Sequence, residues 1–254
     1  MFEQAKIAVI VPCYNESRLI GRMLRRVPHW VDVIIAVDDA SQDATAEAVV
    51  ASGDSRVRLM QHAANQGVGA AIRTGYQASL DAQCDVLIVM AGDDQMDPGD
   101  LPRLITPVLF ATADYVKGNR FIHADALSMP LLRRLGGSAL SAVTRWTSGL
   151  AIDDSQCGFT ALSAAAARQL PLEQLWPRFG YPNDLLLLLA ARGMRVAEVP
   201  VRPVYADEKS GLRPWHMLQI MGVIARRFWR EPALRSLRAG QRAQIASYAQ
   251  RLLP

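Results

Sequence analysis

The sequence predicts an α/β protein whose central sheet is mainly parallel. Over the first hundred residues, short runs rich in β-branched residues alternate with segments whose apolar residues recur at helical spacing. Polar residues follow each run directly, as expected where parallel strands end at one edge of a sheet. The chain has 254 residues, half of them apolar, which is enough for one large domain with a substantial core.

Four strands are expected before residue 100. They cover residues 7–11, 33–37, 57–60 and 86–90. The helix after the first strand has its apolar positions on one face, at Leu19, Ile20, Met23, Leu24 and Val27. Ser41 or Asp43 is expected to cap the helix after the second strand, and a helix of small residues is expected at 69–80. This order of strands and helices predicts parallel pairing.

The second half of the chain has a less regular pattern. The expected elements are a strand and turn at 114–120, one or two amphipathic helices at 127–150, a strand at 158–162, a helix at 183–191, a strand at 196–199 and an amphipathic helix at 214–230. No repeat, low-complexity block or linker rich in proline and glycine divides the chain into two domains.

Composition excludes several classes of protein. Cys13, Cys84 and Cys157 are widely separated, which argues against a disulfide framework or a zinc site and favours a reducing compartment. The chain starts without the pattern of a secretory signal, and no apolar run approaches the roughly 18 residues that a membrane-spanning helix needs. We therefore expect a cytoplasmic protein.

Positive charge is concentrated in the C-terminal part. Of a formal net charge of +4, residues 213–254 carry +7, from eight arginines and the single acid Glu231, and residues 1–212 carry −3. We expect a main domain at 1–212 and a basic amphipathic helical extension at 213–254. The extension has no recognisable reading motif for nucleic acid, so no nucleic-acid partner is expected.

The turns that follow the strands are expected to converge in one cleft. Asp38 and Asp39 can accept hydrogen bonds from a base or a ribose, although a helix cap and turn would explain them equally well. Residues 65–71 include Gly67 and begin a helix whose free N–H groups can face a phosphate, with Arg73 one turn further on. Such glycine turns are common and are not specific alone.

Three other groups of polar residues are candidates for the site. Asp93, Asp94 and Gln95 follow an apolar strand and suit a divalent cation that bridges phosphates, although an acidic turn before a helix explains them too. Asp184 is either a first-turn acid favoured by the helix dipole or a cleft acid that orients an acceptor. Lys209 and Arg213 lie in a polar loop that either folds over a diphosphate or is an ordinary surface loop.

Taken in order, these motifs closely resemble those of the family 2 glycosyltransferases. The matching segments are residues 12–16, 37–45, 65–71, 95–98, 117–121, 154–159 and 198–201, and the resemblance spans roughly residues 5–212. It is greatest with the dolichol-phosphate mannosyltransferases and their bacterial polyprenyl-phosphate relatives. The resemblance implies a single nucleotide-diphosphosugar transferase domain of the GT-A, Rossmann-like type, which uses a nucleotide diphosphate sugar as donor.

The resemblance also implies roles for matching residues. The nucleotide pocket would be lined by Pro12, Tyr14, Glu16 and Asp39, and Asp93 and Gln95 would be ligands of Mg²⁺ or Mn²⁺. Arg120 would present a cation to phosphate, and Asp154 would supply an acid near the acceptor. One departure from the family pattern is Ala91, which stands where the family has the first carboxylate of its metal motif. Metal use is therefore less secure than nucleotide use.

Two helical segments suggest a lipid acceptor. In the resembling group, a segment equivalent to 127–150 rests on the membrane surface and guides a lipid phosphate to the sugar. Here that segment carries Arg133, Arg134 and Arg145 among leucines. The segment 214–230 likewise combines Trp215, Leu218, Met221, Ile224 and Phe228 with Arg226, Arg227 and Arg230. Packing on the protein is the alternative for both segments.

The expected reaction is a one-step inverting transfer to an acceptor oxygen. A lipid phosphate is already anionic and needs little help from a base, whereas a sugar hydroxyl needs one, for which Asp154 is the first choice. The alternatives are a soluble family member acting on a saccharide or small-molecule hydroxyl, and a non-catalytic module that binds nucleotide sugars. The sequence leaves open the sugar, the base, the acceptor and whether the chain forms a homo-oligomer.

Overall fold

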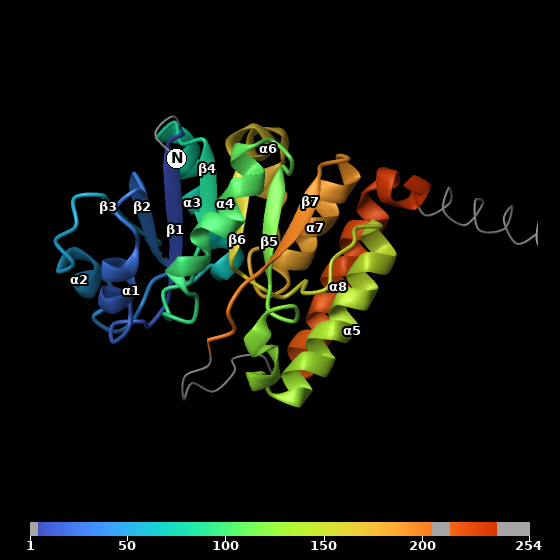
Figure 1. The fold of residues 1–254 in the computed structure, drawn as a ribbon, viewed down its shortest axis with the longest axis horizontal. Coiled ribbons are helices and arrows are strands. Elements are labelled where there is room, and N and C mark those ends of the chain that lie inside the picture. The colour runs from blue at the N-terminus through green and yellow to red at the C-terminus, as the bar shows by residue number, and fades with distance from the viewer. Residues whose placement is uncertain (1–4, 205–213, 238–254) are drawn as a thin grey trace, which may run out of the picture.

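The computed structural model describes residues 5–204 and 214–237, without the side chains of 127, 128, 132, 133 and 214, and confirms the α/β fold (Figure 1). Its sheet has seven strands in the order β3-β2-β1-β4-β6-β5-β7. They are β1 Ile7–Cys13, β2 Val33–Asp38, β3 Val57–Gln61, β4 Val86–Val89, β5 Tyr115–Asn119, β6 Thr160–Ser163 and β7 Val196–Pro200. Only β6 runs antiparallel to its neighbours β4 and β5, and the other described pairs are parallel, so the sheet is mainly parallel as predicted.

Helices cover both faces of this sheet. The helices are α1 Ile20–Arg26, α2 Thr45–Val50, α3 Val68–Asp81, α4 Leu101–Leu109, α5 Leu131–Ser148, α6 Ala164–Gln169, α7 Tyr181–Ala191 and α8 Pro214–Arg230, with short 3₁₀ helices at Pro98–Asp100, Ala124–Ser128 and Leu172–Gln174. Alternate residues of β1 point to opposite faces, so Val9 packs towards α1 and α4, and Ile10 packs towards α3 and α7. Close packing requires Gly75 in α3, because a Cβ there would lie 2.1 Å from Ile10 Cγ2.

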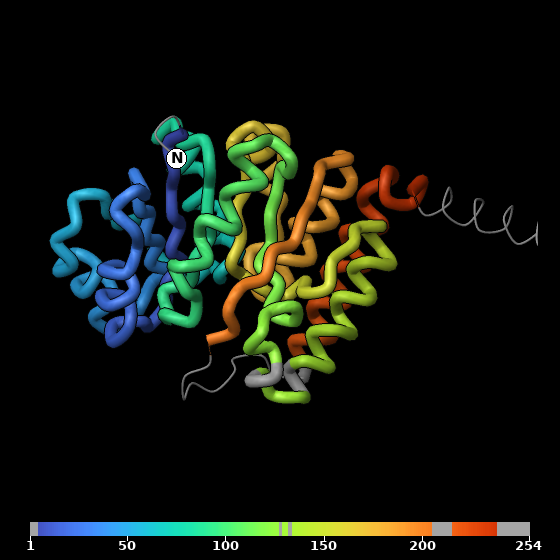
Figure 2. The backbone as a smooth tube through the Cα atoms, viewed as in Figure 1, coloured from blue at the N-terminus to red at the C-terminus, as the bar shows by residue number. Residues whose placement is uncertain are grey.

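A further group of helices lies beyond the β7 edge of the sheet. In Figure 2, α5 and α8 run side by side at this end of the molecule, and α8 also packs against α7. Their shared core contains Leu140, Leu187, Ile220, Ile224 and Leu234. Within the described residues, no helix is long and apolar enough to cross a membrane.

Some details differ from the sequence-based expectations. The helix α4 was not expected, because Pro102 near its start and Pro107 inside it obscure the helical pattern. Helix α6, a run of alanines, has no apolar periodicity to reveal it. Ala44 occupies the N-cap of α2 and makes no side-chain cap bond, but of the two expected caps Asp43 does serve the helix start, because its Oδ1 accepts from Thr45 N at 3.1 Å. The Ser41 hydroxyl instead accepts from Asn15 N at 2.9 Å.

Candidate active site

The loops that follow β1, β2 and β3 lie side by side at the carboxyl edge of the sheet. Cys13 is paired with Asp38, and Asp38 with Gln61, in the strand register. Beyond the strand ends, Asp39 N donates to Cys13 O at 3.0 Å, and His62 N donates to Asp38 O at 2.9 Å. The convergence of these three turns is therefore confirmed.

Asp39 anchors the Gly67 turn. Its carboxylate, only 3 % exposed, accepts from Gln66 N at 2.9 Å and from Gly67 N at 2.7 Å. His62 Nδ1 lies 2.7 Å from Asp39 Oδ1, and its Nε2 lies 3.0 Å from Thr74 Oγ1. Sequence reasoning missed His62, although its position directly after the third strand is the same signal that selected Asp39.

The same turn is held from the other side by residues 176–178. Gly67 has a φ of +101°, and a Cβ there would lie 2.5 Å from Pro177 O. A Cβ on Gly69 would lie 2.1 Å from Trp176 O. Ala70 N donates to Pro177 O at 3.0 Å, so one N–H at the start of α3 is already occupied. The two glycines therefore allow close approach of a second backbone segment.

Asp38 organises the turn after β2. Its Oδ1 accepts from Ser41 N at 3.1 Å and also from the Ser41 hydroxyl. The loop after β1 is joined to this turn, because Glu16 N donates to Thr45 Oγ1 at 2.8 Å. At the end of β1 and in the loop after it, Pro12 and Glu16 are partly buried and Tyr14 is exposed. The loop therefore presents an aromatic ring next to the Asp38 turn.

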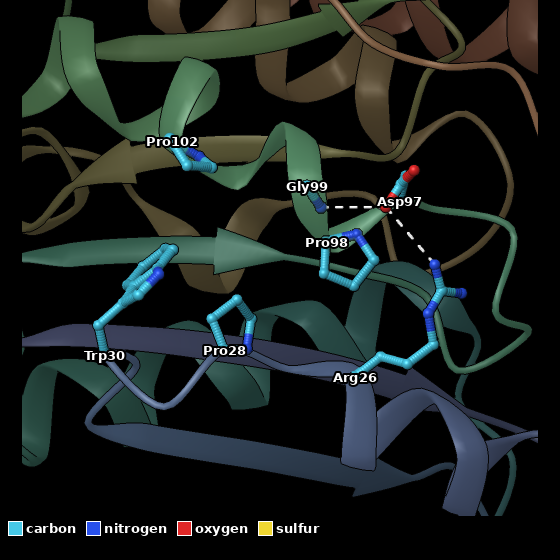
Figure 3. Close-up of a pocket in the computed structure, with 7 residues that line it drawn as sticks. All are labelled: Arg26, Pro28, Trp30, Asp97, Pro98, Gly99 and Pro102. Atoms are coloured by element: carbon cyan, nitrogen blue, oxygen red, sulfur yellow. Dashed lines mark hydrogen bonds and ion pairs between the residues drawn. The ribbon is translucent and has the colours of Figure 1, made fainter.

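Asp94 is bonded to two arginines of α1. It has a φ of +56° and is buried, and its two oxygens lie 2.6 Å from Arg22 Nε and 2.5 Å from Arg26 Nη1. Figure 3 shows Arg26 extending towards Asp97, whose Oδ1 lies 3.5 Å from Arg26 Nη2. Asp94 therefore ties the acidic turn to α1, and because both of its oxygens are engaged by arginines its expected role as a ligand of a divalent cation is not supported.

Asp93 and Gln95 remain as candidate metal ligands. Both are partly buried, and Asp93 Oδ1 accepts from Gln95 N at 3.1 Å, which brings the two residues together in one turn. Across the described ranges, no group of three or more His, Cys, Asp or Glu residues is placed to hold a metal ion. The protein thus offers a two-residue oxygen set, which fits a cation that takes its other ligands from phosphate and water.

Arg120, the residue directly after β5, forms an ion pair with Asp154. Arg120 Nε lies 2.7 Å from Asp154 Oδ2, Arg120 Nη2 lies 3.0 Å from Oδ1, and Arg120 N also donates to Oδ2. Glu198 accepts from Asp154 N at 2.9 Å and from Asn119 Nδ2 at 2.8 Å. The fully buried Lys117 donates from Nζ to Cys157 O.

The charges in this network shift one another's pKa values. Burial alone would raise the pKa of Asp154, but the guanidinium of Arg120 outweighs it and holds that pKa below its usual range. Burial lowers the pKa of Lys117 and raises the pKa of Glu198. An ionised Asp154 with both oxygens engaged is a weak base, which disagrees with its expected role as the base for a hydroxyl acceptor.

Asp184 belongs to a second buried ion pair. Its oxygens lie 2.7 Å from Arg227 Nε and 2.8 Å from Arg227 Nη2, and Oδ2 also accepts from Trp176 N at 2.8 Å. The expectation that Asp184 is a cleft acid is thus not supported, because its carboxylate is occupied by α8 and by backbone. Arg227, assigned from sequence to a lipid-facing edge, is buried in this pair.

Of the remaining expected cations, Arg73 is the one that the structure describes. Arg73 donates to Glu173 O at 3.3 Å and lines a hollow with Arg226 and Arg230, rather than the Gly67 turn. Lys209 and Arg213 lie outside the described residues.

Helices α5 and α8 each leave large apolar side chains exposed. They are Leu131, Leu135 and Trp146 on α5, and Trp215, Leu218, Met221 and Trp229 on α8. In Figure 1, β1 and β5 point towards the end of the molecule that carries the candidate-site loops. Helices α5 and α8 both begin at that same end. On α5, Arg134 is also exposed, whereas the side chain of Arg133 is outside the described part of the chain.

Comparison with known proteins gives consistent matches. The model of the family described as Glycosyl transferase family 2 matches residues 8–149. The undecaprenyl-phosphate mannosyltransferase of Micrococcus luteus is 31 % identical over 204 residues, which cover 77 % of this chain and 82 % of that protein. The UDP-N-acetylglucosamine–dolichyl-phosphate N-acetylglucosaminyltransferase of Methanococcus voltae is 27 % identical, with 79 % and 86 % covered.

Solved structures support the fold. Glucosyl-3-phosphoglycerate synthase from Mycobacterium tuberculosis in complex with UDP has a TM-score of 0.69 at 20 % identity, over 89 % of this chain and 81 % of that one. Its complex with Mn²⁺, UDP and phosphoglyceric acid has a TM-score of 0.68 at 19 % identity, over 89 % and 80 %. The GT-A-like fold of the chain is shared with these structures.

Proposed function

This chain belongs to glycosyl transferase family 2 and is a nucleotide-sugar glycosyltransferase, and we propose that its acceptor is a polyprenyl phosphate at a membrane surface. The donor sugar leaves its nucleoside diphosphate and becomes linked to the lipid phosphate.

The donor is assigned to the carboxyl edge of β1 to β4. In this proposal the Gly67 turn, the loop 12–16, Asp38 and Asp39 form the nucleotide pocket, with the exposed Tyr14 ring beside the base. UDP is bound by a structural relative that shares the fold, which supports a nucleotide as the ligand. Asp93 and Gln95 would hold Mg²⁺ or Mn²⁺ together with the diphosphate. Such a cation supplies positive charge that stabilises the leaving group.

The state of Asp154 is the observation that carries the acceptor assignment. The side chain is fully buried and bonded to Arg120, and its pKa is held down, so it is poorly suited to take a proton from a hydroxyl. A phosphate acceptor is already ionised at neutral pH and requires no such base. The side chain of Arg120 is 23 % exposed, so its guanidinium is the group that this network can present to an anion.

In this proposal Asp154 therefore positions Arg120 instead of acting as a base. An oxygen of the lipid phosphate attacks the anomeric carbon, the bond from that carbon to the diphosphate oxygen breaks, and the configuration inverts. Arg120 orients the incoming phosphate. Arg120 would offset the charge of the incoming phosphate and a cation held by Asp93 and Gln95 would offset that of the diphosphate, which lowers the cost of bringing two anions to one carbon.

The relatives and the surface support a lipid acceptor in different ways. Two sequence relatives are named for transfer to undecaprenyl phosphate and dolichyl phosphate. The exposed apolar side chains of α5 and α8 lie on the helices that begin at the site's end of the molecule. A helix with one packed face and one exposed apolar face suits the boundary between head groups and acyl chains.

A pair of matched acceptors tests this proposal. Vesicles are prepared with a polyprenyl phosphate or with the corresponding polyprenol, which differs only in lacking the phosphate, and are supplied with a panel of labelled UDP-sugars and GDP-sugars. We expect one donor to label the phosphate lipid and none to label the alcohol. Equal labelling of the alcohol, or transfer to a soluble saccharide alone, would overturn the lipid-phosphate assignment.

A further inference from the structure

The buried ion pair between α7 and α8 is more than a link between two helices. Asp184 and Arg227 are 1 % and 2 % exposed, and burying such a pair is costly unless its remaining polar atoms are also bonded. Those atoms are bonded to the segment 174–176, because Arg227 Nη2 donates to Gln174 O at 2.8 Å and Trp176 N donates to Asp184 Oδ2 at 2.8 Å. The pair therefore fixes the backbone of that segment.

The next residues of the segment fix the start of α3. Pro177 O accepts from Ala70 N at 3.0 Å. The backbone of residues 176–178 also fills the space where Gly67 and Gly69 have no Cβ. A shift of this segment would thus be transmitted directly to the Gly67 turn.

The Gly67 turn in turn contacts Asp39. Gln66 N and Gly67 N both donate to the carboxylate of Asp39, the residue after β2 that we assign to the nucleotide pocket. The turn is therefore held between Asp39 on one side and Pro177 on the other. An unbroken series of hydrogen bonds and backbone contacts runs from α8 to the pocket.

We propose that Arg227 and Asp184 are positioning residues for the donor pocket, a role that rests on the proposed nucleotide binding. Through residues 174–178 they hold the Gly67 turn in its nucleotide-binding geometry. Seating of α8 and binding of the nucleotide then stabilise each other, because coupling between two sites is reciprocal. Since α8 also carries exposed apolar side chains, contact with the lipid surface would favour the donor-binding state.

Substitution of Arg227 tests the link from the α8 side. Arg227→Met keeps much of the side-chain volume and removes the guanidinium. The matched control is Arg195→Met, since Arg195 is an exposed arginine that pairs with Asp114 at 2.7 Å and not with Asp184. Both are titrated with UDP well below their thermal midpoints. We expect at least about tenfold weaker UDP binding for Arg227→Met, and wild-type affinity for the control.

Hydrogen exchange separates positioning from a loss of stability. In Arg227→Met, we expect faster amide exchange in residues 62–71, where the turn is held, as well as in α7 and α8. A merely structural role would speed exchange in the two helices alone and leave UDP affinity unchanged. That result in a folded Arg227→Met protein would overturn the proposal.

The unmodified protein provides a test that does not depend on the variant folding. Saturating UDP should slow amide exchange at residues 174–178 and in α8, besides the loops at 12–16 and 65–71. Protection of those loops without any change at 174–178 and α8 would contradict the coupling while leaving the proposed function intact. Absence of binding to both UDP and GDP would instead overturn the proposed function, and this inference with it.

Discussion

Charged side chains inside the protein decide what the acceptor end of the site can do. Lys117 and Asp154 are fully buried beside Arg120, and each charge is tolerated because another lies close to it. The folded-state pKa of Asp154 lies below its ordinary value of 3.8, so its ionised form contributes stability above that value. This contribution is lost as the pH falls through the folded-state pKa.

Removing the charge of Asp154 should destabilise the protein strongly at neutral pH. Asp154→Asn leaves Arg120 and Lys117 without their carboxylate, which should lower the free energy of unfolding by about 3–5 kcal/mol. The neighbouring Asp153 pairs with Arg145 at the surface, so Asp153→Asn should cost less than about 1 kcal/mol. Urea denaturation of both variants checks this prediction.

The pH dependence of the same variant is a second readout. The difference between the wild type and Asp154→Asn should shrink as the pH falls below 3.8, because the carboxyl takes up a proton first in the unfolded chain and then, at its lower pKa, in the folded protein. A difference that stays constant through this range would show that the carboxylate charge is not what stabilises the network.

The metal ligands give a third prediction at the scale of single residues. With Ala91 in place of a carboxylate and Asp94 held by two arginines, Asp93 and Gln95 are the two protein ligands that we propose for a cation that prefers about six oxygens. Calorimetry should therefore detect weak Mn²⁺ binding to the free protein and stronger binding with UDP present. Asp93→Asn should abolish transfer without unfolding the protein, whereas Asp94→Asn should lower the thermal midpoint and keep the Mn²⁺ response.

Two results would contradict this metal assignment. Tight Mn²⁺ binding without nucleotide would mean that the protein supplies more ligands than these two residues. Full transfer in excess chelator would mean that the leaving diphosphate is stabilised by cationic side chains alone.

The sequence singled out three acids as candidates but did not reveal their partners. Asp39, Asp154 and Asp184 were all selected, and each is bonded to a residue far along the chain: His62, Arg120 and Arg227, at separations of 23, 34 and 43 residues. Local patterns contain no information about such pairings, because they depend on how the elements pack. Consequently two acids expected to face substrates are instead engaged by arginines.

At the scale of elements, α8 has two apolar faces with different surroundings. Ile220, Val223 and Ile224 are buried against the protein, whereas Leu218 is 76 % exposed and Met221 and Trp215 are also accessible. The spacing of apolar residues predicted the helix. Because apolar residues lie around much of its circumference, the sequence did not show which face packs on the protein. The structure assigns Ile224 to the protein side, and Trp215 and Leu218 to the exposed side.

The exposed face of α8 should bind anionic vesicles. Sedimentation with such vesicles should retain the wild type at low salt and release part of it at high salt, because charges are screened over about 8 Å at physiological ionic strength. Leu218→Glu should reduce retention, because it places a charge on the exposed face. Phe110→Glu is the control, since Phe110 is equally exposed at the end of α4.

A protein that remains in solution at low salt would remove the physical support for the lipid acceptor. Equal loss of retention in Phe110→Glu would show that the effect is one of overall charge and not of α8.

At the scale of the whole molecule, the two halves of the sheet carry the proposed donor and acceptor sites. Strands β1 to β4 carry the loops assigned to the nucleotide, and β5 to β7 carry Arg120 and its network. The first half was predictable because its strands alternate with helices and all pair in parallel: β1 with β2, β2 with β3, and β4, which follows β3 through α3, with β1. The insertion of β6 between β4 and β5 was not, because an antiparallel strand from a distant segment leaves no local pattern.

The proposed function requires a nucleotide pocket built around Asp39 at the carboxyl edge of this sheet. Calorimetric titration of UDP and GDP, with Mn²⁺ present, into the wild type, Asp39→Ala and the exposed control Asp81→Ala tests it most directly. We predict that one nucleotide binds the wild type and the control alike and binds Asp39→Ala at least about tenfold more weakly, a loss of roughly 1.4 kcal/mol. Unchanged nucleotide affinity in a folded Asp39→Ala protein would contradict the account.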